Sequence, residues 1–194
     1  DVTSNEELTT IKAQFEQMEA LIAAPDFPGN NYLDLIDGGS VADYLIVYML
    51  TDNEEINHPK STYIYKTSTG KYTMGPIWDF DWAFGYEGSN THFSSYSRPL
   101  FWSSSSVGTL FFSRILSDPQ IKEMVRQKWS DFKSGKLTEL LAFADEYSTL
   151  IEGARYYDYQ LWKRGGADFT NEVSNLKTWL NNRVSYLDTY IGSL

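Results

Sequence analysis

Apolar residues recur at helical spacing near the start of the chain. Ser4 and Glu7 have the spacing of a capping box, and one apolar face follows them: Leu8, Ile11, Phe15, Met18 and Ile22. Pro25 ends this predicted helix. A second helix is predicted to begin at Ser40, and because residues 41–50 are apolar almost all round, we expect it to be the buried central helix.

The C-terminal part of the chain has the same helical period. Asp118 and Pro119 are typical of a helix start, and this helix is predicted to stop near Gly135. A long helix is predicted over residues 137 to about 163. The last helix, over residues 170–192, has an apolar face at helical spacing: Val173, Leu176, Leu180, Val184, Leu187 and Ile191.

Between these helical parts the pattern changes to that of β-structure. Residues 62–65 and 71–74 are short runs of β-type residues around the turn sequence Ser68-Thr69-Gly70, which predicts one hairpin. No internal repeat or linker interrupts the chain. The predicted fold class is therefore mainly α (α+β), a single helical domain over residues 1–194 with one inserted β-hairpin.

The composition of the 194 residues, 42% of them hydrophobic, is that of one globular domain. A formal net charge of −10 repels a phosphate backbone, so we expect no nucleic-acid partner. The absence of Cys excludes disulfides, Cys-ligated zinc and thiol catalysis, and a count of 2 His argues against a histidine-rich metal site. No apolar run approaches the roughly 20 residues of a membrane span, so no transmembrane segment is expected in this chain. Because the first residue is Asp1 rather than Met, we expect a processed protein or a piece of a longer one.

Aromatic residues are concentrated in residues 63–102, which hold twelve of them in forty positions, against 16% for the whole chain. Three of the six Trp lie there, at positions 78, 82 and 102, and a Ser-rich loop covers residues 94–106. Aromatic side chains either fill a core or form a binding surface. The segment is therefore predicted to be the core junction or a binding face.

Four acidic residues stand out because they follow predicted elements. Asp52 and Glu55 come after the central helix, and Asp79 and Asp81 come after the hairpin. If the two loops converge, their carboxylates can hold a hard cation such as Mg²⁺, or act as an acid and a base with different pKa values. Each residue also has a purely structural interpretation, as a cap of a helix or a turn.

The sequence Trp78-Asp79-Phe80-Asp81-Trp82 sets two carboxylates among aromatic residues. An ionised carboxylate in apolar surroundings costs several kcal/mol unless a cation or backbone N–H groups compensate it. We therefore expect Asp79 and Asp81 to lie within the folded body, with at least one carboxylate bound to backbone N–H groups or to a cation. Glu54, in its acidic loop, is expected to be exposed.

Motifs through most of the chain carry a resemblance to a known family. They are Ile36-Asp37, Tyr44-Leu45, Asn53, Lys60-Ser61-x-Tyr63-x-Tyr65, Gly70-Lys71, Gly75-Pro76-x-Trp78-Asp79-Phe80-Asp81-Trp82-x-Phe84-Gly85, Phe111-Phe112-x-Arg114-Ile115-Leu116-x-Asp118-Pro119, Trp129 and Leu180-x-x-Arg183-x-x-x-Leu187. In these positions the chain resembles the CotH family of atypical protein kinases, first met in bacterial spore coats. The block from Trp78 to Gly85 is the most specific part.

The resemblance implies a two-lobed, kinase-like enzyme that transfers a phosphoryl group from ATP to serine. This chain would be its C-terminal helical lobe, and we expect the N-terminal lobe to lie outside it. On this resemblance Asp79 is the first choice for binding Mg²⁺ and Asp81 is the second, since kinases hold the ion with an aspartate.

The resemblance also suggests catalytic and cofactor-binding residues. Asn53 begins the family's Asn-x-Asp pattern, Glu55 stands where the catalytic aspartate is expected, and Asp52 is the alternative beside the acceptor hydroxyl. Lys60 could contact a phosphate of ATP, and Ser61 stands where the family has asparagine. Glutamate is one methylene longer than aspartate, and a shift of about 1 Å in a catalytic group can cost on the order of 100-fold in rate. Because the N-terminal lobe is expected outside this chain, we expect the chain alone not to turn over ATP.

Two other functions fit the same residues. A non-catalytic surface module would bind carbohydrate or protein through the aromatic, Ser-rich loop of residues 82–102, because Trp and Tyr rings stack on sugars. A glycosidase would need two carboxylates roughly 5–9.5 Å apart across a cleft. Composition and resemblance are compatible with an extracytoplasmic protein, secreted or at the cell surface, and we expect a monomer.

Overall fold

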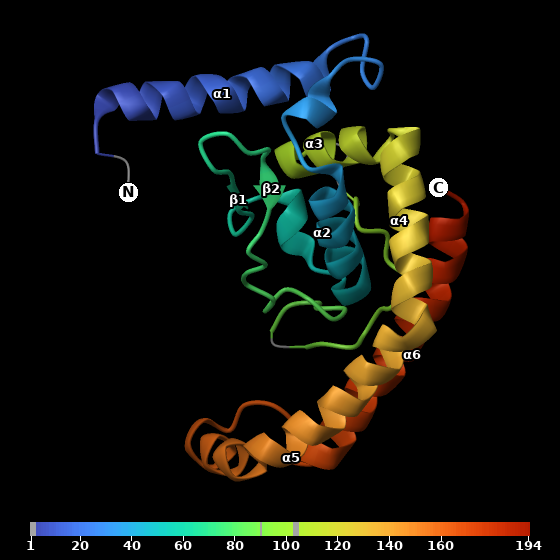
Figure 1. The fold of residues 1–194 in the computed structure, drawn as a ribbon. Coiled ribbons are helices and arrows are strands. Elements are labelled where there is room, and N and C mark those ends of the chain that lie inside the picture. The colour runs from blue at the N-terminus through green and yellow to red at the C-terminus, as the bar shows by residue number, and fades with distance from the viewer. Residues whose placement is uncertain (1–2, 90, 103–104) are drawn as a thin grey trace.

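The computed structural model describes residues 3–89, 91–102 and 105–194, so residues 103–104 of the Ser-rich loop lie outside the described residues. Its helices are α1 (Asn5–Ala23), α2 (Gly38–Thr51), α3 (Val107–Leu116), α4 (Pro119–Asp131), α5 (Leu137–Trp162) and α6 (Phe169–Gly192), with the short turns η1 (Tyr32–Asp34), η2 (Glu54–Asn57) and η3 (Phe132–Lys136). Strands β1 (Ile64–Tyr65) and β2 (Thr73–Met74) pair antiparallel, with Ile64 opposite Met74. The predicted fold class, mainly α with one hairpin, is confirmed (Figure 1).

The central helix is α2, as its apolar composition predicts (Figure 1). Its completely buried residues are Val41, Ala42, Leu45, Tyr48 and Met49. The helix begins earlier than Ser40 because Asp37 caps it: Oδ1 of Asp37 accepts the N–H of Gly39 at 2.9 Å. It ends at Asp52, whose φ of 53° is left-handed, and this residue starts the first loop of the candidate site.

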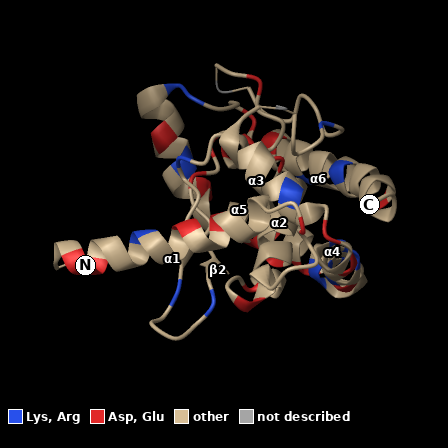
Figure 2. Ribbon diagram, turned by 90° about the horizontal axis from the view of Figure 1, so that it is seen from above, with Lys and Arg blue, Asp and Glu red and all other residues tan. Residues whose placement is uncertain are grey.

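Helix α1 begins at the predicted cap, since Oγ of Ser4 accepts the N–H of Glu7 at 3.1 Å. The expected apolar face is buried only in its second half, through Met18 and Ile22, whereas Leu8 and Ile11 are about half exposed. Figure 1 shows the reason: the first half of α1 extends beyond the rest of the molecule. Figure 2 shows acidic positions at both ends of this helix.

Helix α3 is not among the elements that the sequence pattern predicts. Oγ of Ser106 caps it by accepting the N–H of Thr109 at 3.4 Å. Gly108 lets α3 pack closely on η2, because a Cβ at this position would lie 1.9 Å from the carbonyl oxygen of Ile56. This contact fixes η2, which carries Glu55, against the helical body.

The predicted stop near Gly135 is wrong, because α4 and α5 are joined by the π-helical turn η3 that contains this glycine. A glycine in a helix costs only about 1 kcal/mol relative to alanine, so it does not by itself end one. Helix α5 ends at Trp162, as predicted, and α6 runs back along it (Figure 1). We call α5 and the facing half of α6, residues 137–180, the arm. No described helix is both long enough and apolar enough to cross a membrane.

Candidate functional site

Two loops meet beside the C-terminal end of α2. The first loop follows α2 and the second follows β2. Nδ2 of Asn53 donates to the backbone oxygen of Asp79 at 2.9 Å, and the backbone N–H of Phe84 donates to the backbone oxygen of Thr51 at 2.5 Å. These bonds hold the loops together, so that acidic side chains from both of them form one cluster.

Asp79 and Asp81 form a carboxylate pair in the second loop. Their side chains hydrogen-bond to each other, and Oδ2 of Asp79 also accepts the hydroxyl of Ser61 at 3.0 Å. The φ of Asp79 is 64°, a left-handed conformation that aspartate tolerates better than most residues. The hydrogen bond that protonated Asp81 donates to the Asp79 carboxylate, then desolvation, then the charge of Asp79 raise the pKa of Asp81.

The prediction that Asp79 and Asp81 lie within the folded body is wrong, because both are exposed. The segment is a turn rather than a strand, and it is Phe80 and Ala83 that pack inward. The flanking Trp78 is 60% exposed, so the aromatic neighbours do not bury the carboxylates. The backbone N–H groups of Asp81 and of the next residue act on this carboxylate to lower its pKa, against the larger effect of Asp79.

Glu55 contributes the third carboxylate, from the first loop. It lies in η2, is only 7% exposed, and its N–H donates to Oδ1 of Asn53 at 3.0 Å. Burial, followed by the negative charges of Asp79 and Asp81, raises the pKa of Glu55, and the charge of Lys60 opposes this effect. Glu55 is therefore a stronger proton acceptor than an ordinary glutamate.

Lys60 and Ser61 border this cluster. Lys60 is exposed and close enough to act on the pKa of Glu55, and Ser61 is half-buried against Asp79. Among the described residues, no group of three or more His, Asp and Glu side chains is placed to hold a metal ion. A cation at this site would therefore have Asp79 and Asp81 as its protein ligands and would need water or substrate to complete its shell.

Asp52 has different surroundings, although it is adjacent to Asn53 in the sequence. Its carboxylate is 2% exposed, with Oδ1 3.2 Å from the guanidinium of Arg183 and Oδ2 3.0 Å from that of Arg98. Burial raises the pKa of Asp52, and the two guanidinium groups act in the opposite direction. Both carboxylate oxygens of Asp52 are thus engaged in ion pairs. Asp52 therefore stabilises the fold rather than taking part in chemistry at the site.

Arg98 and Arg183 are ion-pair partners of Asp52 to which no sequence motif assigns a role. The guanidinium of the completely buried Arg183 also donates to the backbone oxygens of Met49 at 2.8 Å and of Tyr96 at 2.9 Å. Arg98 also pairs with Glu54 at 2.6 Å, so Glu54 is half-buried and partnered rather than exposed as predicted. One signal could have found Arg183: an arginine on the apolar face of the last helix needs buried acceptors.

Exposed aromatic rings extend from this cluster along the second loop. Trp82 is 41% exposed and stacks with Tyr86 at a centroid distance of 6.4 Å, and Tyr86 lies 5.2 Å from the ring of His92. The aromatic segment is predicted to be either a binding face or part of the core. Trp82, Tyr86 and the exposed Trp78 fit a binding face, whereas the buried Tyr72 belongs to the core. The rings lead from the carboxylates toward a cavity on the other side of the loop.

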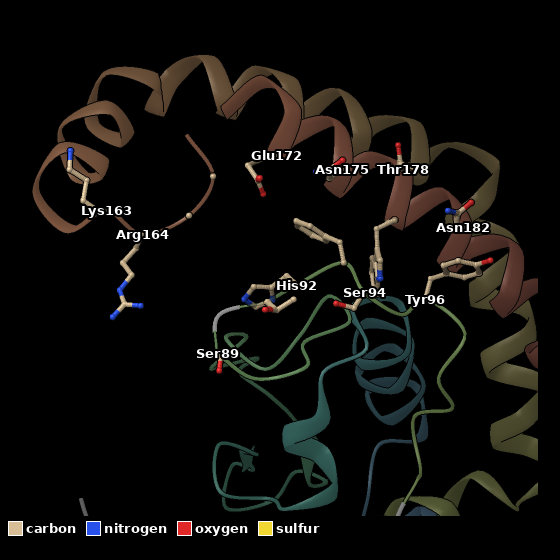
Figure 3. Close-up of a pocket in the computed structure, with 15 residues that line it drawn as sticks. Ser89, His92, Ser94, Tyr96, Lys163, Arg164, Glu172, Asn175, Thr178 and Asn182 are labelled. Atoms are coloured by element: carbon tan, nitrogen blue, oxygen red, sulfur yellow. The ribbon is translucent and has the colours of Figure 1, made fainter. Parts of the chain in front are cut away.

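This cavity, of about 800 Å³, lies between the loop segment of residues 91–96 and the arm (Figure 3). One wall is a row of polar side chains on α6: Glu172, Asn175, Thr178 and Asn182. Arg164, from the turn between α5 and α6, stands at its open end, and His92 forms part of the opposite wall. Such a lining suits a polar ligand rather than an apolar one.

The fold and the cluster together define a mainly helical protein with exposed carboxylates suited to a divalent cation. The family model described as CotH kinase protein matches residues 1–187, nearly the whole chain. The chain therefore belongs to the CotH kinase family, and the resemblance in its sequence motifs is confirmed. Neither curated proteins nor solved structures give a significant match.

Proposed function

We propose that this chain supplies the metal-binding and acceptor side of the phosphoryl-transfer site of a CotH-type protein kinase. The observation that carries the proposal is the cluster itself: an exposed carboxylate pair, Asp79 and Asp81, beside the buried Glu55. Membership of the CotH kinase family supports kinase chemistry in general terms. The roles of individual residues follow from their surroundings.

Asp79 and Asp81 would hold Mg²⁺. Two ionised carboxylates in hydrogen-bond contact repel each other unless a proton or a cation lies between them, so this pair suits a divalent ion. Mg²⁺ commonly takes one or two protein carboxylates and completes its shell with water and substrate phosphates, so a third protein ligand is not required. When bound, the ion supplies neutralisation of the phosphate charge.

Glu55 would act as the general base. In the transfer, the oxygen of the acceptor serine forms a bond to the γ-phosphorus of ATP, the bond to the leaving ADP oxygen breaks, and the hydroxyl proton passes to Glu55. Its raised pKa favours this role, because a base is most effective when its pKa lies near the working pH. Asp52 stays outside this assignment because Arg98 and Arg183 engage its oxygens.

Three neighbours would support the reaction. Asn53 is a positioning residue, since its side chain bonds both the N–H of Glu55 and the carbonyl oxygen of Asp79. Ser61 orients the Asp79 carboxylate, and the exposed Lys60 would contact a phosphate of ATP. We further propose that a second lobe completes the nucleotide pocket, that this chain alone is inactive, and that the protein works outside the cytoplasm.

The test is phosphate transfer from radiolabelled ATP, with Mg²⁺, by the full protein that contains this chain. Glu55→Gln and Asp79→Asn should each lower the rate by about 100-fold or more, the usual contribution of a general base or of a charge-stabilising group. Glu54→Gln is the matched control, because it changes the neighbouring carboxylate, which pairs with Arg98 instead. Equal incorporation by all variants, with unchanged circular dichroism, would overturn the proposal.

The second candidate is binding of carbohydrate or of another protein. It rests on the polar cavity of about 800 Å³ and on the exposed rings beside it, a combination suited to sugar hydroxyls and sugar faces. Glycan-array binding should be lost in Asn182→Ala, which lines the cavity, and kept in Asn181→Ala, whose amide bonds the backbone of its own helix. A silent array for the unmodified protein would remove the carbohydrate function.

A further inference from the structure

Helix α5 has an apolar face without a partner among the described residues. None of its 26 residues is buried, although it is longer than any other described helix. Helices in soluble proteins are stabilised mainly by burying one apolar face against the rest of the molecule. One side of α5 lies along α6, but its second apolar side faces solvent.

This second side forms a heptad pattern. Its members are Phe143, Tyr147, Leu150, Ala154, Tyr157 and Leu161, which alternate in spacing between four and three residues. All six are exposed, up to 76% at Leu150. We call these residues the α5 seam. Alternating spacings of four and three are those of a helix that packs against another helix along its length.

The seam continues into an apolar groove of about 930 Å³ at the base of the arm. Phe143 and Tyr147 belong to both. The other walls come from Leu50 at the end of α2, from Phe84 in the second loop, and from Val173, Leu176 and Leu180 of α6. Seam and groove therefore form one continuous apolar surface along the arm.

We propose that this surface binds a second copy of this chain, with the two arms antiparallel about a two-fold axis near Gly153. The spacing of the seam residues is the same in both directions along the helix, so an antiparallel second copy can place its seam residues opposite them about a two-fold axis. The pairs are Phe143 with Leu161 of the partner subunit, Tyr147 with the partner's Tyr157, and Leu150 with the partner's Ala154. Two arms packed in this way form a four-helix bundle, in which the exposed seam of each arm is buried against the seam of the other.

Size and charge agree with this occupant. Each of the five large seam residues exposes roughly 100 Å² of side-chain surface. Two arms would therefore bury on the order of 1,000 Å² in total, which is about the smallest area of a specific protein–protein interface. The antiparallel order separates the basic tips of the two arms, Lys163 and Arg164 of each copy, by the length of an arm. A parallel order would instead bring the two basic tips together.

Analytical ultracentrifugation, from micromolar to hundred-micromolar protein, tests the association. We expect a dimer that strengthens with salt, because each copy carries a net charge of −10 that salt screens. Leu150→Glu should give a monomer with unchanged circular dichroism, since this side chain contacts solvent in a single copy. The matched control is Tyr156→Glu, an exposed position of the same helix that lies off the seam.

Cysteine crosslinking tests the register, because the chain has no Cys of its own. In the antiparallel register Glu146 lies opposite Gln160 of the partner subunit. A mixture of Glu146→Cys and Gln160→Cys proteins should therefore form disulfide-linked dimers on oxidation, and neither variant should do so by itself. A monomer at every concentration and salt level, a dimer insensitive to Leu150→Glu, or no mixed disulfide would each overturn the proposal.

Discussion

The carboxylates of Asp52 and Asp79 have opposite surroundings, although hydrogen bonds, one of them from Asn53, hold together the loops that carry them. Asp52 is 2% exposed and paired with two guanidinium groups, whereas Asp79 is exposed and faces a hydroxyl and a second carboxylate. The residue type is the same in both places. Burial and partners therefore decide which carboxylate serves the fold and which is available for chemistry.

The largest effect is expected at the buried ion pairs. Asp52→Asn keeps the shape of the side chain but leaves the charge of the buried Arg183 without its carboxylate partner. Removing one member of a buried pair costs about 3–5 kcal/mol, which lowers the Tm of a chain of this size on the order of 10 °C. Thermal melts followed by circular dichroism measure this change.

Asp79→Asn is the matched control for that substitution, since it makes the same chemical change at the surface. Its effect on the free energy of unfolding should stay within about 0.5 kcal/mol, as for most surface positions. Equal losses for Asp52→Asn and Asp79→Asn would contradict the contrast between the two carboxylates.

A smaller effect is expected at Asn53, the residue that joins the two regions. It is completely buried, and Asn53→Ala removes the acceptor for Glu55 and the donor for Asp79. An unsatisfied buried polar group costs about 1–3 kcal/mol, and urea denaturation should show a loss of this size. An Asn53→Ala protein as stable as the unmodified one would show that neither bond contributes to the fold.

Local pattern was enough to predict much of the fold. The burial of α2, the presence of the hairpin, the C-terminal end of α5 and the extent of α6 follow from the spacing of apolar residues and from capping residues. The element order made convergence of the two acidic loops possible but did not require it. Helix α3 does not follow from the local pattern, because its cap at Ser106 ends a Ser-rich run that is typical of a loop.

The surroundings of the carboxylates were not predictable in the same way. The aromatic neighbours of Asp79 suggested burial, but the left-handed backbone at this residue belongs to a turn, so its exposure does not follow from the residues beside it in sequence. The partners of Asp52 come from positions 98 and 183, far along the chain, and only the fold brings them together. Sequence separation, rather than residue type, set the limit.

Mg²⁺ should stabilise the exposed cluster and leave the buried pairs unaffected. A ligand at a hundred times its Kd raises the free energy of unfolding by about 2.7 kcal/mol, so saturating Mg²⁺ should raise the Tm by a few degrees. The shift should be absent in Asp79→Asn and retained in Glu54→Gln, whose carboxylate pairs with Arg98 in the unmodified protein. A shift that persists in Asp79→Asn would place the ion elsewhere.

The smallest effect concerns the protonation of Asp81. Its pKa is raised chiefly by the hydrogen bond that protonated Asp81 donates to Asp79, and a raised pKa means that the folded protein holds this proton more tightly than the unfolded chain does. The pair therefore contributes stability that is fully present below the unfolded pKa and is lost as the pH rises through the folded pKa.

In Asp79→Asn the pKa of Asp81 should fall, because the new amide donates to the ionised form and the neighbouring charge is gone. Mg²⁺ should lower it as well, since a cation favours the ionised carboxylate, and carbon NMR titration of the side-chain carboxyl groups would follow both shifts. A titration of Asp81 that neither the substitution nor the ion moves would mean that the two carboxylates do not act as a pair.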